Sequence, residues 1–193
     1  AETCTLQTRP RAGTLGGEDV PYGSFKNKSG YRCLIHDLRV GDGAQPSAVT
    51  WTGKDSGASV RCFLNGQAGA EFILGRAPII RPTKNLPALK DKFQGPYLMR
   101  RRAGNVGITS AFAAVYDAWT SKGQPRLDAV EWLAPEPADE FCVAARVRIG
   151  GREDIIYCSA DQTPRSVAGV QVRGRVAIVS RRNAEVAWGY VYG

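Results

Sequence analysis

A single histidine, His36, is present among the 193 residues, and this scarcity limits the catalytic and metal sites that the chain can form. A Ser-His-Asp or Cys-His site would have to use His36, with Asp37 beside it in the sequence. Adjacent residues of a strand point to opposite faces, so Asp37 is poorly placed to orient the imidazole. A zinc site needs three or four histidine, cysteine or carboxylate ligands, and no such set stands out. We predict a structural histidine, with His36 and Asp37 only as fallback catalytic residues, no metal and no cofactor.

Motifs for several other functions are missing. The chain has no Gly-x-Gly-x-x-Gly or Walker-type loop, and no RNP, helix-turn-helix or zinc-finger signature. No run of residues approaches the ~18 apolar positions of a membrane helix. Neighbouring carboxylates are usually solvated turn residues, so a glycosidase-type pair has no support here. Such neighbours occur at Glu18-Asp19, Asp139-Glu140 and Glu153-Asp154.

One pattern occurs twice in the sequence. Residues 33–41 (CLIHDLRVG) and 142–150 (CVAARVRIG) share a cysteine, an arginine, a β-branched residue and a final glycine at equivalent positions. Each is followed by a second cysteine, then by an Ala-Gly opening and a Gly-Arg-x-x-Ile segment. These markers predict a tandem duplication into units 1–97 and 98–193. Chance similarity among Gly- and Arg-rich strands is the alternative.

The five cysteines lack Cys-x-x-Cys spacing and have strand-like neighbours, which favours disulfides over zinc. The duplication pairs Cys33 with Cys62 and Cys142 with Cys158. Cys4 is then free, bonded to another chain, or a replacement for one of these partners. The AETC start, without an initiator Met, is typical of a mature protein after signal-peptide removal. We therefore predict a secreted or periplasmic protein, with reduced cysteines in a cytosolic protein as the alternative.

The net charge is +8, from 26 Lys and Arg against 18 Asp and Glu. Such an excess favours polyanionic partners, although it serves solubility equally well. Arginine forks bind phosphate or carboxylate through two parallel hydrogen bonds, so a run of three arginines is a candidate anion site. Alternate arginines on strands would add a basic face, with aromatic residues at 188–192 nearby, as in proteins that bind single-stranded nucleic acid. The predicted ligand-binding residues are Arg100, Arg101, Arg102, Arg146, Arg148, Arg173 and Arg175.

Alternation of apolar and polar residues predicts strands over much of the chain. At 34–40, Leu34, Leu38 and Val40 share one face with His36, and Ala145 takes the equivalent position in the second motif. Further strands are predicted at AVTWTG, SVRCFL and 170–179. The C-terminal VAWGYVYG forms a last strand, with its three aromatic residues on one side.

Two segments have helical spacing. Residues 110–121 follow the i, i+3, i+4, i+7 rule with Phe112, Val115, Tyr116 and Trp119, and residues 85–93 have an Asn cap and an early proline. The predicted fold class is therefore α+β and β-rich. It consists of two related antiparallel β units with one or two short helices, and the helix at 110–121 precedes the second unit.

These features favour a non-catalytic binding or interaction protein. Its basic surface would hold an anionic ligand (a glycan, a lipid head group or nucleic acid) or an acidic protein. The first alternative is a small secreted hydrolase or transferase, toxin-like, with a site between the two units. The second alternative is a structural subunit of an envelope assembly.

Overall fold

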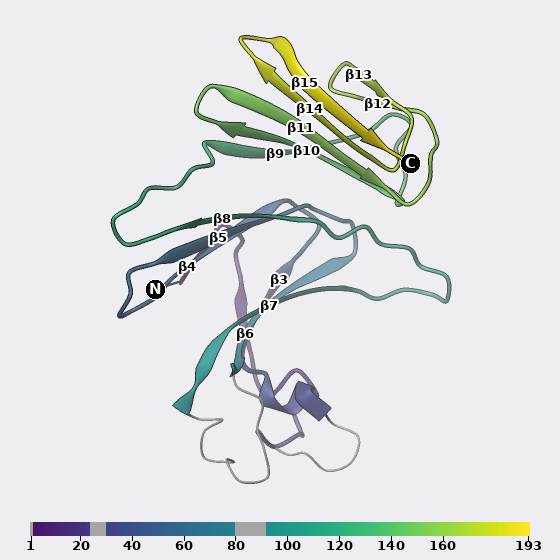
Figure 1. The fold of residues 1–193 in the computed structure, drawn as a ribbon. Helices are drawn as coiled ribbons and strands as arrows, with labels where there is room; N and C mark the ends of the chain where they lie inside the picture. The colour runs from purple at the N-terminus through teal and green to yellow at the C-terminus, as the bar shows by residue number, and fades with distance from the viewer. Residues whose placement is uncertain (1, 24–29, 80–91) are drawn as a thin grey trace. The chain divides into compact units, whose positions relative to one another are not determined.

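The structure, a computed structural model, describes residues 2–23, 30–79 and 92–193 (Figure 1). About 54% of the chain is β-strand in antiparallel sheets, and helix is nearly absent. A short 3-10 helix, η1 (Gly30–Leu34), precedes the third strand. Across the described ranges, no helix is long and apolar enough to cross a membrane. The prediction of a β-rich antiparallel protein is confirmed.

The chain divides into two compact units that interleave along the sequence. Unit 1 comprises residues 1–5, 45–68 and 104–193, and unit 2 comprises residues 6–44 and 69–103. The expectation from the sequence was two consecutive segments, 1–97 and 98–193, related by duplication. The fold does not show the duplication, so it and the consecutive segments stay predictions.

Unit 2 is built on one antiparallel sheet with the strand order β2-β3-β6-β7. These strands are β2 (Arg9–Arg11), β3 (His36–Asp42), β6 (Ala70–Pro78) and β7 (Gln94–Arg102). Leu38 and Val40 of β3 face the same side as Ile73 of β6, because directly opposite residues of paired strands share a face. This side carries the core of the unit, which also contains Leu15, Ile35 and Ala77.

Unit 1 contains a four-stranded sheet, a five-stranded sheet and a hairpin, all antiparallel (Figure 1). The first sheet has the order β1-β4-β5-β8, with β1 (Glu2–Cys4), β4 (Ser47–Thr52), β5 (Ser59–Leu64) and β8 (Ala114–Trp119). The second has the order β15-β14-β11-β10-β9, with β9 (Ala129–Leu133), β10 (Cys142–Ile149), β11 (Arg152–Ser159), β14 (Val176–Arg182) and β15 (Glu185–Tyr192). The hairpin pairs β12 (Arg165–Val167) with β13 (Val170–Val172).

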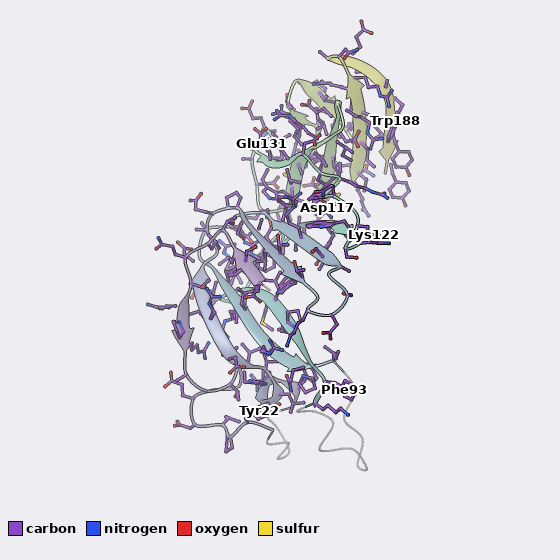
Figure 2. All side chains as sticks on the ribbon, turned by 90° about the vertical axis from the view of Figure 1, so that its left-hand side faces the viewer. Tyr22, Phe93, Asp117, Lys122, Glu131 and Trp188 are labelled. Carbon is purple, nitrogen blue, oxygen red and sulfur yellow. The ribbon has the colours of Figure 1, made fainter. Side chains whose placement is uncertain are left out.

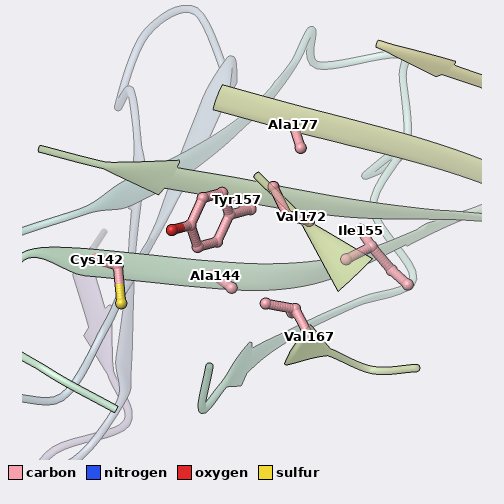
Figure 3. Packing of buried hydrophobic residues seen from close by; sticks show 7 residues of the cluster. All are labelled: Cys142, Ala144, Ile155, Tyr157, Val167, Val172 and Ala177. Carbon is pink, nitrogen blue, oxygen red and sulfur yellow. The ribbon is translucent and has the colours of Figure 1, made fainter. Parts of the chain in front are cut away.

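One face of the five-stranded sheet packs against the β12–β13 hairpin (Figure 3). Tyr157 of β11 lies between Ala144 of β10 and Ala177 of β14, its directly opposite neighbours. The small alanines leave room for the tyrosine ring, and Val167 and Val172 of the hairpin complete the buried cluster. Each large side chain buried here stabilises the unit by roughly 1.5–3 kcal/mol.

The helix predicted at 110–121 is wrong, because this segment contains strand β8. The apolar alternation of β8 is difficult to recognise in the sequence because of Asp117. Asp117 points inward with only 4% of its surface exposed, while Tyr116 points outward. The Asp117 carboxylate accepts hydrogen bonds from Arg61 Nη2 at 3.0 Å and from the backbone N–H of Arg126 and Leu127 at 3.2 Å. A buried, fully partnered carboxylate breaks the apolar pattern on which the prediction relied.

The other predicted helix, 85–93, lies almost entirely outside the described residues. The strands predicted at AVTWTG, SVRCFL, 142–150 and the C-terminus are confirmed. The single strand predicted at 170–179 is wrong, because this segment forms two strands, β13 and β14, that belong to different sheets and are interrupted at residues 173–175. The strand predicted at 34–40 begins two residues later, at His36, because η1 extends to Leu34.

Candidate functional site

The predicted disulfides are absent, and the four cysteines assigned to them, Cys33, Cys62, Cys142 and Cys158, carry free thiols. Cys142 lies opposite Ser159, while Cys158 lies opposite Val143 on the neighbouring strand. These two cysteines therefore point to opposite faces of one sheet, with Cys142 buried and Cys158 exposed, and a bond between them is geometrically excluded. Cys33 and Cys62 are buried in different units. The duplication predicted the pairing from sequence order alone, without regard to which face each thiol takes.

His36 lies among three polar partners at the start of β3. Its Nδ1 is 3.1 Å from Asp37 Oδ2, and its Nε2 is 3.2 Å from Gln94 Oε1. Gln94 Nε2 donates to the hydroxyl of Tyr22 at 2.8 Å, and the Tyr22 ring packs edge-on against the imidazole. Within the described residues, no serine, threonine or cysteine side chain hydrogen-bonds to His36. The arrangement orients the imidazole, and none of the described hydroxyl or thiol groups is placed for it to activate.

The expectation that Asp37 is poorly placed to orient His36 is wrong. Asp37 has a positive φ of 52°, and the pairing of β3 with β6 shifts register between His36 and Arg39. In a regular strand the two side chains would point to opposite faces, whereas this bulge turns the carboxylate back onto the imidazole. No feature of the local sequence marked the bulge.

The predicted arginines of unit 1 do not form one basic face with the C-terminal aromatic residues. Arg146 pairs with Glu131 at 2.7 Å and with Glu153 at 3.3 Å, and Arg148 pairs with Glu153 at 3.6 Å. The register places Arg146 and Arg148 on the hairpin side of the sheet, while Trp188 is opposite Ser180 on the other side. The remaining two, Arg173 and Arg175, are exposed between β13 and β14 and form no ion pair with a described residue.

The triplet Arg100–Arg102 is divided between the two faces of β7. Arg101 lies opposite Glu71 and forms an ion pair with it at 2.5 Å. Arg100 points to the other face, where its Nη2 donates to the carbonyl oxygen of Gly43 at 3.0 Å and burial lowers the pKa of its guanidinium. Three consecutive strand residues cannot grip one ligand from the same side.

A groove runs beside the edge strand β2 on the core-bearing face of unit 2. It consists of two adjoining hollows of about 440 Å³ and about 610 Å³ that share Arg9, Val40 and Glu71. We call this the β2 groove. Its charged lining residues are Arg9, Arg11, Glu18, Asp42, Glu71 and Arg101.

Two arginines of the β2 groove are available to a ligand. Arg9 and Arg11 lie opposite Val40 and Leu38, so both side chains project to the groove side of the sheet. Neither forms an ion pair with a described residue. Thr8 Oγ1 also borders the groove, and it is buried without a hydrogen-bond partner. The sequence predicts an extended N-terminal arm or a short edge strand, followed by a loop, for the Gly- and Pro-rich residues 1–30, and these arginines were not among the predicted ligand-binding residues. The feature of the sequence that could have identified them is Arg-Pro-Arg at 9–11, because two arginines separated by one residue share a face in a strand.

The two units differ sharply in charge. Unit 2 contains 14 Lys and Arg against 6 Asp and Glu, whereas unit 1 contains 12 of each. The whole net charge of +8 therefore belongs to unit 2. The net charges of residues 1–97 and 98–193 do not show this difference, because each of these segments contains residues of both units.

A buried arginine in unit 1 forms a second polar cluster, of a different kind. The Arg165 side chain is 0% exposed and forms ion pairs with Asp139 and Asp161. Hydrogen bonds from Arg165 hold the pKa of Asp161 well below its usual range. Burial alone would raise the pKa of Asp139, but hydrogen bonds from Arg165 and from the Phe141 N–H lower it overall. Further partners of Arg165 Nη1 are Tyr157 Oη, Ser159 Oγ and the Thr163 carbonyl oxygen. Both terminal nitrogens of Arg165 are therefore partnered, whereas its Nε is buried without a hydrogen-bond partner, and this arrangement indicates a structural role.

Among the described residues, no three histidine, cysteine or acidic side chains gather as a metal site would require. Comparison of the chain with protein-family models, with curated proteins and with solved structures gave no match.

Proposed function

We propose that the chain is a non-catalytic binding protein whose unit 2 holds an anionic ligand or an acidic partner in the β2 groove. The observation that carries this proposal is the confinement of the whole +8 charge to unit 2. A field of one sign raises the local concentration of oppositely charged partners and speeds their association. Export to the periplasm or the exterior remains a prediction from the sequence.

The spacing of the groove arginines supports an extended ligand. Two residues apart on a strand, Arg9 and Arg11 are separated by about 6.8 Å along β2. Each guanidinium can form two parallel hydrogen bonds with a phosphate or carboxylate. The described lining of the groove contains no aromatic side chain, so recognition would rest on charge and hydrogen bonds instead of base stacking.

The test compares two double variants, Arg9→Ser with Arg11→Ser in the groove and Arg173→Ser with Arg175→Ser in unit 1 as the control. Each removes two positive charges, so the change in net charge is the same. On an immobilised oligonucleotide or heparin column, the groove variant should elute at lower salt than both the control and the wild type. In solution, its slope of log affinity against log salt should flatten by roughly 1.4–1.8, since each lost contact contributes about 0.7–0.9.

Equal shifts for both double variants would mean that binding follows net charge and uses no site, which would contradict the proposal. A triple variant with Arg100, Arg101 and Arg102 replaced by Ser tests whether the run of three arginines, which the sequence predicts as an anion site, contributes to binding. We expect a smaller change per arginine, because only Arg101 shares the face of the groove and its charge is already paired with Glu71.

A further inference from the structure

Strand β15 lies at one end of the five-stranded sheet, with only β14 paired to it among the described residues (Figure 1). All eight of its residues are exposed. Trp188 and Tyr190 are 47% and 51% exposed, and Figure 2 labels Trp188 on this last strand. The other exposed large side chains of β15 are Val186, Val191 and Tyr192. An edge strand of this length and composition can pair with another strand.

The two edge strands of the unit 2 sheet carry the protection that β15 lacks. Edge strand β2 has Pro10 between two arginines, and edge strand β7 has Pro96 and ends in three arginines. Prolines and charges are the usual features that prevent edge-to-edge pairing. Strand β15 has neither proline nor a basic residue, and its only charge is Glu185 at its start. Ser180 of β14 pairs with Trp188, but the next residue, Arg181, pairs with Val186, so Ala187 forms a bulge. This bulge separates Glu185 from the uncharged segment Trp188–Tyr192.

We propose that Trp188–Tyr192 pairs in antiparallel fashion with the same segment of a second copy of this chain. A twofold axis perpendicular to the sheet preserves its faces, and it can place Tyr190 directly opposite Tyr190 of the second copy. Trp188 then lies opposite Tyr192 of the second copy. All three pairs fall on the face that carries Ile178 and Val176 of β14, since these residues lie opposite Tyr190 and Tyr192. Aromatic pairs across strands stabilise a sheet.

The distribution of charge favours a second copy meeting this strand. Unit 1, which contains β15, has 12 basic and 12 acidic residues, whereas unit 2 carries the net +8. Two copies that meet through β15 join neutral units, and the paired segment itself holds no charge. Contact through unit 2 would oppose like charges.

The strand edge alone provides a modest interface. A fully buried aromatic side chain contributes about 150–250 Å², and the three here are about half exposed, so each copy adds roughly 300 Å² from them. This places the pair among transient interfaces, below about 1,200 Å². The dimer should therefore depend on concentration.

The experiment is sedimentation velocity on the full chain over a concentration series. The wild type should shift from the monomer mass toward twice that mass. Tyr190→Lys should remain monomeric, because the twofold axis sets two ammonium groups opposite each other. The matched control is Phe141→Lys, a residue 49% exposed in the same unit, which should associate as the wild type does. Tyr190→Thr, which keeps a strand-forming side chain, should weaken association roughly three- to tenfold.

A mixture of Tyr190→Lys and Tyr190→Glu should restore the dimer, because the axis brings the ammonium of one variant against the carboxylate of the other. Circular dichroism verifies that each variant keeps the wild-type sheet. A wild type that stays monomeric at all concentrations overturns the proposal. Equal loss of association in Phe141→Lys, or failure of the mixed folded variants to associate, overturns it too.

Discussion

Arg165 shows how a single residue stabilises part of unit 1. Its guanidinium joins Asp139, in the loop before β10, to Asp161, in the loop after β11, and it also contacts Tyr157 in the core. A buried charge is tolerated only when its partners replace the water that it has lost. Here every partner lies in unit 1, so the cluster ties two loops to the sheet and the hairpin.

We predict that Arg165→Met destabilises the protein by about 3–5 kcal/mol, because it leaves two carboxylates without their buried partner. The control, Arg148→Met, removes a half-exposed ion pair with Glu153 and should cost no more than about 1 kcal/mol. Urea unfolding followed by fluorescence measures both. Similar midpoints for the two variants would contradict a structural role for the Arg165 cluster.

The same cluster predicts the acid sensitivity of the fold. Asp139 and Asp161 have lowered pKa values in the folded state, so their stabilisation is present above their unfolded pKa, near 4. It is lost as the pH falls below that value and these carboxylates become protonated. The free energy of unfolding should therefore decrease below about pH 4, and this decrease should be smaller in Arg165→Met. An unchanged pH dependence in the variant would mean that other carboxylates cause it.

The cysteines allow a second test at the residue scale. Cys158 is exposed, whereas Cys33, Cys62 and Cys142 are buried, so a maleimide should label Cys158 faster than these three in the native protein. Burial of the thiol group raises the pKa of Cys158, which should slow labelling relative to a solvated cysteine. Mass spectrometry of alkylated, non-reduced protein reports the rates. A cross-linked peptide joining any two of Cys33, Cys62, Cys142 and Cys158 would contradict the free thiols of the structure.

At the scale of elements, the predictable strands are those with one apolar face. Strands β5, β10 and β14 follow regular alternation and were recognised from it. Strand β8 was mistaken for a helix because its inward face contains Asp117, which pairs with Arg61 from a distant part of the sequence. The orientation of Asp37 was missed because a bulge depends on the partner strand β6. Such errors arise where long-range contacts override local pattern.

At the scale of the whole molecule, the sequence predicts a basic binding protein, but it does not show which basic residues share a surface. The predicted set mixed arginines of both units, and in unit 1 the strand arginines are already paired with Glu131 and Glu153. The β2 groove could not be predicted, because Arg9 and Glu71 meet only when β2, β3 and β6 assemble into one sheet. Long-range strand pairing decides which charges share a surface, and composition does not report it.

The central claim is that unit 2 contains a specific anion site. The most direct measurement is an NMR titration of the amide-labelled full chain with inorganic polyphosphate at moderate salt. We predict saturable shifts at residues 7–9, 11–12, 40–42 and 70–71, which line the β2 groove, while the amides of β10, β11 and β14 stay unchanged. Arg9→Ser with Arg11→Ser should abolish the saturation. Shifts spread evenly over both units, without saturation, would contradict the claim.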